Sequence, residues 1–173
     1  LSDGSGMEIA FTLFDWTSGD YWEKYYPIRI DWPDGYKIEF TRDTTGRVLT
    51  AEDNRGQYAE YTWTDGPAAD GSLDVISQVE IDTQYDGIAF DPQVRIEYEY
   101  DDFEVWPRGR VLMGVEVTDL ASSQLTKDVS YEYVETVNTA GVPSLSAVYD
   151  GRLSGGLTFP YATFGYSGDF DTA

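Results

Sequence analysis

Carboxylates are the residues of this sequence with the most potential for chemistry. The chain has 32 Asp and Glu against 11 Lys and Arg, and it contains neither histidine nor cysteine. The absence of these two residue types excludes Ser-His-Asp triads, thiol catalysis and metal sites built on Cys or His. Two uses of the carboxylates stay open: paired acids for glycoside hydrolysis, and oxygen ligands for calcium.

Glu97 and Glu99 are the best-placed pair for acid–base catalysis. Alternate residues of a strand lie on the same face, and this spacing permits the separation of roughly 5–10 Å that glycosidases use. In a chain this acidic, such pairs also arise on any solvated strand face. We therefore expect no catalytic residues and no enzyme activity.

Loop acids close to glycine are the candidate cation ligands. Asp31 lies near Asp34-Gly35, and Asp86 lies near Asp91. Calcium binds several oxygens of this kind, although neither segment matches the EF-hand pattern Asp-x-Asp-x-Asp-Gly. Turn formation and solubility account for the same acids, so structural calcium is an alternative prediction, and no other cofactor is expected.

Aromatic residues form a dense group between positions 16 and 32. Its members are Trp16, Tyr21, Trp22, Tyr25, Tyr26 and Trp32. Such side chains form platforms that stack on sugar rings, but they also pack within sheets and cores. The group is therefore a candidate glycan- or protein-binding site, with sheet packing as the alternative.

The net charge and hydropathy exclude several classes of partner. A formal charge of −21 repels nucleic-acid phosphates and anionic lipid headgroups. The chain has no apolar run near the ~18 residues that a membrane-spanning helix needs. We therefore expect neither nucleic-acid binding nor a membrane span.

Alternation of apolar and polar residues is the main structural signal. It is clearest in Val94–Tyr100, and it also places Met7, Ile9, Phe11 and Leu13 on one face of an N-terminal strand. Gly, Asp, Asn and Pro separate such segments throughout the chain. The pattern predicts an all-β fold of about 11 antiparallel strands, in a meander or sandwich, within a single domain spanning residues 1–173.

Two segments of the chain resemble each other, which predicts a duplicated four-strand unit. Lys37–Asp43 followed by Gly46-Arg47-Val48-Leu49 corresponds to Arg95–Asp101 followed by Gly109-Arg110-Val111-Leu112. The repeat units span about residues 36–82 and 94–150, between an N-terminal strand at 7–13 and a C-terminal strand at 156–166. Chance alternation of common strand residues is the alternative explanation.

The repeated segments resemble the YD-repeat proteins of the Rhs type and the YD-like secreted proteins of Bacteroidetes, over about residues 36–153. The family pattern is roughly Tyr-Asp-x-x-Gly-Arg-Leu, then a turn and a Tyr-x-Tyr strand. Asp43-Thr44-Thr45-Gly46-Arg47-Val48 fits this pattern with Arg42 in place of the tyrosine, Tyr100-Asp101 fits with a lengthened turn, and Tyr149-Asp150-Gly151-Arg152-Leu153 lacks the two spacers. The resemblance implies a sheet built hairpin by hairpin on a secreted or surface protein, without catalysis.

Two functions follow from these observations. The first is a non-enzymatic structural or adhesive β-protein, extracellular or at the cell surface, which self-associates in a filament or other assembly. Its assembly strand is the one with Met7, Ile9, Phe11 and Leu13, since a terminal strand can add to a neighbour's sheet edge. The alternative is a monomeric secreted module that binds a glycan or a protein through the aromatic group at 16–32.

Overall fold

The structure is a computed structural model that describes residues 6–13, 25–64, 74–103, 109–135, 143–151 and 160–165. Every strand or helix within these residues is a β-strand. The strands are β1 (Glu8–Leu13), β2 (Tyr25–Asp31), β3 (Lys37–Arg42), β4 (Val48–Asp53), β5 (Tyr58–Thr64), β6 (Val75–Asp82), β7 (Val94–Phe103), β8 (Gly109–Asp119), β9 (Gln124–Glu135), β10 (Pro143–Asp150) and β11 (Pro160–Thr163).

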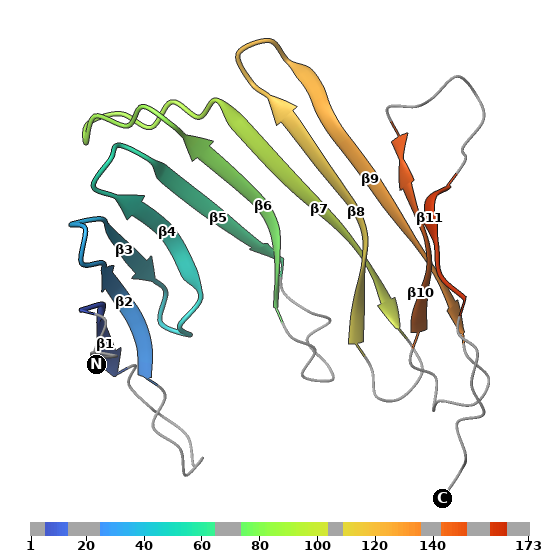
Figure 1. The fold of residues 1–173 in the computed structure, drawn as a ribbon, viewed down its shortest axis with the longest axis horizontal. Coiled ribbons are helices and arrows are strands. Elements are labelled where there is room, and N and C mark those ends of the chain that lie inside the picture. Colours follow the sequence, from blue (N-terminus) through green and yellow to red (C-terminus); the bar gives the residue numbers. More distant parts are fainter. Residues whose placement is uncertain are drawn as a thin grey trace, which may run out of the picture. The chain divides into compact units, whose positions relative to one another are not determined.

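The strands form one antiparallel sheet whose order follows the chain from β1 to β11 (Figure 1). The predicted all-β meander is therefore confirmed. The predicted strand at 7–13 matches β1, and the predicted strand at 156–166 is described only over 160–165, where 160–163 form β11. The described residues contain no helix that is long and apolar enough to cross a membrane.

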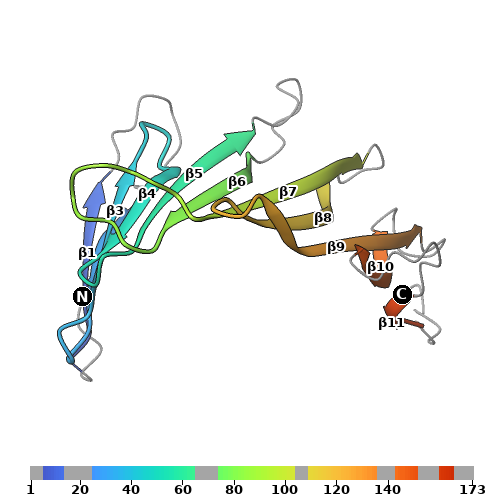
Figure 2. The ribbon, with the colours of Figure 1, turned by 90° about the horizontal axis from the view of Figure 1, so that it is seen from above.

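Contacts divide the chain into two compact units. Unit 1 contains residues Leu1–Thr62 and Val79–Val94, and unit 2 contains Trp63–Gln78 and Arg95–Ala173. Strands β1 to β4 belong wholly to unit 1, β8 to β11 belong wholly to unit 2, and the boundary crosses β5, β6 and β7. Within each unit the strands lie in a single layer (Figure 2).

The strand register of unit 1 separates an apolar face from a polar face. Residues that pair directly across antiparallel strands point to the same side of the sheet. The pairs on the apolar side are Ile9 with Ile30, Ile30 with Ile38, Phe40 with Ala51, and Ala51 with Ala59. The alternation that predicted the strands thus corresponds to two distinct faces.

Three successive hairpins of unit 1 share one turn geometry. Their three-residue loops are residues 33–35, 44–46 and 54–56, and they end in glycines with φ of +82°, +92° and +86°. A type I turn followed by a glycine in the left-handed region is a common way to join two strands by three residues. The sequences Pro-Asp-Gly, Thr-Thr-Gly and Asn-Arg-Gly therefore place the reversals of the chain.

The two predicted repeat segments differ at their turns. Asp43 lies in the turn between β3 and β4, whereas Asp101 lies within β7, which continues to Phe103. The second segment has five additional residues between its two blocks, and the resemblance of this segment to the YD pattern stays a prediction. Whether the rest of the two segments superpose stays a prediction.

Little of the described sheet is fully buried. Val79 and Ala147 are the buried apolar residues, with 7% and 4% of their surface exposed. The other described apolar side chains whose burial is known are half-buried or exposed. In a single layer, neighbouring side chains of the sheet cover each residue from the sides, but no second layer packs on top of it. A sheet of this kind needs a further layer or a partner to bury its apolar face.

Candidate functional site

The candidate site with the most contacts between its parts is one end of unit 1, which we call the loop end. It consists of the turn at 33–35, the turn at 54–56 and the loop at 83–93. In an antiparallel meander alternate turns lie at the same end of the sheet, so the turn after β2 lies beside the turn after β4. Loops held by a rigid sheet are the usual place for binding residues.

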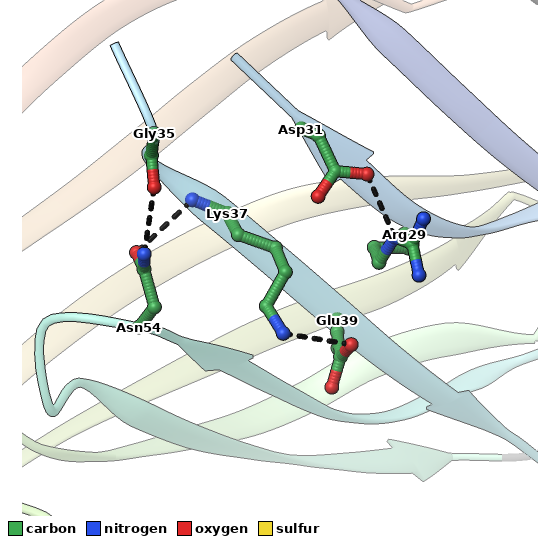
Figure 3. A network of polar contacts seen from close by, with 6 residues as sticks. All are labelled: Arg29, Asp31, Gly35, Lys37, Glu39 and Asn54. Carbon is green, nitrogen blue, oxygen red and sulfur yellow. Dashed lines mark hydrogen bonds and ion pairs between the residues drawn. The ribbon is translucent and has the colours of Figure 1, made fainter. Parts of the chain in front are cut away.

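Asn54 joins the first two turns. Its Nδ2 donates a hydrogen bond of 2.7 Å to the carbonyl oxygen of Gly35, and its Oδ1 accepts one of 3.0 Å from the backbone N–H of Lys37 (Figure 3). The backbone N–H of Asn54 donates in turn to the carbonyl oxygen of Lys37 at 3.1 Å. The side chain of Asn54 thus bonds to backbone groups beyond the ends of the strands, where the hydrogen bonds between strands stop.

Arg55 and two aromatic rings cover the same end. The Arg55 guanidinium lies 4.4 Å from the centre of the Tyr36 ring, and the Tyr36 and Trp32 ring centres are 5.0 Å apart. Arg55 also donates to Asp34 at 3.4 Å, but both side chains are more than 60% exposed, so this ion pair contributes little to stability. Arg55 is therefore a cation that is positioned by stacking and remains accessible.

The loop at 83–93 is held by a buried carboxylate. Asp82 is 2% exposed, and it accepts hydrogen bonds of 2.8 Å from the N–H of Gln84 and 3.0 Å from the N–H of Asp91. Both bonds lower the pKa of Asp82, and the bond from Asp91 has the larger effect. The N–H of Tyr85 donates to the carbonyl oxygen of Gly56 at 2.9 Å, which ties the loop to the second turn.

Aromatic packing adds to this attachment and leaves one apolar residue exposed. The Tyr58 ring stacks on Tyr85 with centres 4.5 Å apart and meets the edge of Phe90 at 5.3 Å. Ile88 lies between these two loop residues in the sequence, yet 86% of its surface is exposed. The loop therefore displays an aliphatic side chain from a fixed backbone.

A hollow of about 160 Å³ opens on the apolar face of unit 1, close to the loop end. Ile38, Ala51, Ala59 and Ile81 line it with apolar surface, and Tyr36 and Asp53 are also among its lining residues. The hollow exists because Ala51 and Ala59 are small residues on adjacent strands. The Tyr36 hydroxyl donates to Asp53 at 3.1 Å, and partial burial together with this bond raises the pKa of Tyr36.

Four charged residues on the polar face of unit 1 form two ion pairs. Arg29 pairs with Asp31 at 2.7 Å along β2, and Lys37 pairs with Glu39 at 3.0 Å along β3 (Figure 3). The register also places Arg29 opposite Glu39 and Asp31 opposite Lys37, so the four charges alternate in both directions. The hydrogen bond to Asp31 and its charge raise the pKa of Arg29.

Three of the four predicted calcium ligands are engaged in local contacts. Asp31 pairs with Arg29, Asp34 accepts from the N–H of Tyr36 at 3.0 Å, and Asp86 accepts from the N–H of Ile88 at 2.9 Å. Asp91 follows Phe90 in the loop at 83–93. Across the part of the chain that the structure describes, no three acidic side chains are grouped to hold a metal ion, and calcium stays a prediction.

Salt is expected to raise the stability of the protein. A chain with a formal charge of −21 repels itself, and added ions screen the repulsion over a Debye length of about 10 Å at 0.1 M. We expect the urea midpoint to rise between low and high NaCl. A calcium site requires a further rise of the midpoint with calcium chloride at matched ionic strength. A midpoint that changes neither with NaCl nor with calcium chloride contradicts both the charge repulsion and the calcium site.

The predicted aromatic group is only partly described. Trp16, Tyr21 and Trp22 lie outside the described residues. Tyr25 begins β2 and is 55% exposed. The Arg42 guanidinium lies 5.2 Å from the centre of the Tyr26 ring, and the Trp32 ring packs against Tyr36. Tyr26 and Trp32 thus have packing roles, and a platform formed by the six residues stays a prediction.

Unit 2 has an acidic hollow of about 170 Å³ on its polar face. Glu97, Glu99, Glu116 and Asp128 are among its lining residues, so the pair considered for catalysis lies here. Gly114 is buried at the same place, and an added Cβ would lie 3.3 Å from Glu99 Oε2. The missing side chain opens the hollow, and the carboxylates give it a negative potential that attracts cations.

Sequence reasoning did not identify Asn54, Arg55 and Ile88 as surface features. Asp34-Gly35 was considered only as a candidate cation ligand beside a glycine, and the pairing of its turn with the turn at 54–56 depends on the strand register. Comparisons with protein-family models, with curated proteins and with solved structures found no match.

Proposed function

We propose that the chain is a non-enzymatic structural β-protein of an extracellular or cell-surface assembly, in which copies associate through their terminal strands. The strand order carries this proposal. The first and last strands along the chain, β1 and β11, stand at the two ends of the described sheet order. A strand in that position is a template for pairing with another chain.

The side chains of the terminal strands support the same function. Phe11 of β1 is 41% exposed, Tyr161 of β11 is 81% exposed, and Phe164 just after β11 is 47% exposed. β1 pairs with β2 of its own chain, so the proposal is addition to an already paired strand rather than exchange of β1 between copies. The resemblance to secreted YD-repeat proteins favours the same location and the same scaffold role.

Charged residues on the terminal strands test the proposal. We expect the wild-type protein to show a mass above 19.4 kDa by light scattering at high concentration. Phe11→Lys and Tyr161→Lys should lower this mass while circular dichroism stays unchanged, because lysine on an edge strand blocks pairing with another chain. Leu125→Lys is the matched control, since Leu125 is 45% exposed at the start of β9. Equal masses for all variants would overturn the proposal.

A further inference from the structure

The loop at 83–93 presents Ile88 in a fixed conformation. Asp86 Oδ1 accepts hydrogen bonds from the N–H of Ile88 at 2.9 Å and of Ala89 at 3.3 Å, and Gly87 takes a φ of +82°. Single exposed apolar residues are normal on protein surfaces. Here, however, the backbone on both sides is held in place, so Ile88 can enter a partner's pocket with little loss of conformational entropy.

The hollow of unit 1 has the size and polarity of a receptor for such a side chain. Cavities of about 150 Å³ lined by aliphatic groups hold a benzene ring, and the hollow measures about 160 Å³. Its apolar surface comes from Ile38, Ala51, Ala59 and Ile81. Ile88 of the same chain is 86% exposed and therefore does not occupy it.

Arg55 beside the hollow is complementary in charge to the acids of the loop, and Asp53 in the hollow accepts a hydrogen bond from the Tyr36 hydroxyl. Asp86 and Asp91 lie on either side of Ile88 in the loop. Arg55 lies over the ring of Tyr36, which is a lining residue of the hollow, and its side chain is 62% exposed. When Ile88 enters a hollow, an acid of the loop can approach Arg55, whose guanidinium stacks on Tyr36 and has a weak ion pair of 3.4 Å with Asp34.

We propose that Ile88 of one copy docks into the hollow of a second copy. The apolar side chain and the hollow are different surfaces of the same unit, so the contact is heterologous and can continue from copy to copy. The inference deepens the proposed assembly by naming a second contact between copies, one that uses neither β1 nor β11.

Site-directed cross-linking tests the contact. The chain has no cysteine, so Ile88→Cys and Ala59→Cys each introduce a unique thiol. We expect a short bismaleimide to give about tenfold more dimer in a mixture of the two variants than in either variant alone, which corresponds to about 1.4 kcal/mol of preference. Leu49→Cys, at a 41% exposed position of β4, replaces Ile88→Cys in the control mixture and should give only the background yield.

Further variants separate the possible outcomes. Ala51→Cys provides a second position in the hollow if Ala59→Cys does not fold. Arg55→Glu should lower the yield, and Asp91→Lys in the partner variant should restore it. A yield equal to that of the Leu49→Cys control overturns the contact. Phe11→Lys and Tyr161→Lys should leave the cross-link unchanged, so failure of the terminal-strand assembly and failure of this contact are distinguishable.

Discussion

The Gly46→Ala variant is expected to lose about 2–4 kcal/mol of unfolding free energy, through strain and overpacking at the turn between β3 and β4. Gly46 is buried with a φ of +92°, and an added Cβ would lie 2.6 Å from Cε2 of the Tyr26 ring. The ring cannot move away easily, because Arg42 lies over it at 5.2 Å and donates to the carbonyl oxygens of Pro27 and Gly46. Urea unfolding followed by circular dichroism measures the loss.

Gly35→Ala is the matched control for this variant. Gly35 has a φ of +82° at the same position of the preceding hairpin, but an added Cβ meets nothing within 4 Å. Only the strain of placing alanine in the left-handed backbone region applies, so we expect a loss of about 1–2 kcal/mol. In the Tyr26→Ala background, the cost of Gly46→Ala should fall to that of Gly35→Ala. Equal losses for both glycines in the wild-type background would show that the Tyr26 contact is unimportant.

Replacement of Asp43 by Asn is expected to destabilise the same hairpin by about 1.5–3 kcal/mol at neutral pH. Asp43 Oδ1 accepts from the N–H groups of Thr45 at 2.8 Å and Arg47 at 3.0 Å, and Oδ2 accepts from Arg47 Nε at 2.6 Å. The side chains of Asp43 and Arg47 are only 18% and 28% exposed. Asn has a single acceptor oxygen, so it cannot satisfy both the turn and the guanidinium.

The cost of Asp43→Asn should depend on pH. Partial burial acts to raise the pKa of Asp43, but the hydrogen bonds from Thr45 and Arg47 outweigh it and hold the pKa well below its usual range. The unfolded chain binds this proton with a pKa of about 3.9, so the contribution of the carboxylate is complete above that value and is lost as pH falls below it. The difference in unfolding free energy between wild type and D43N should therefore shrink as pH decreases from about 5 to about 2.

Asp34→Asn is the control for the pH series. The Asp34 side chain is 65% exposed and meets Arg55 only at 3.4 Å, so this variant should change stability little at any pH. A difference between wild type and D43N that stays constant across the pH range would contradict the role assigned to the Asp43 carboxylate.

Strand and turn positions follow from local sequence. Met7 to Leu13 and Val94 to Tyr100 alternate, and each of these segments coincides with a strand, because a period of two places apolar residues on one face of any extended chain. Asp43 to Gly46 identified a turn for a similar reason, since an aspartate acceptor and a glycine with positive φ need only their immediate neighbours. These features allowed an all-β fold of about 11 antiparallel strands to be predicted from the sequence alone, whereas the choice of a meander over a sandwich came from the structure.

Tertiary structure decided how side chains from different turns and strands meet. No local pattern shows that Asn54 bonds to Gly35, that Arg55 stacks on Tyr36 or that Tyr26 lies against Gly46, because each contact joins residues brought together by the strand register. The extent of β7, which includes Asp101 and continues to Phe103, is likewise seen only in the structure. The hollow at Ala51 and Ala59 likewise exists only because the register places two small residues side by side.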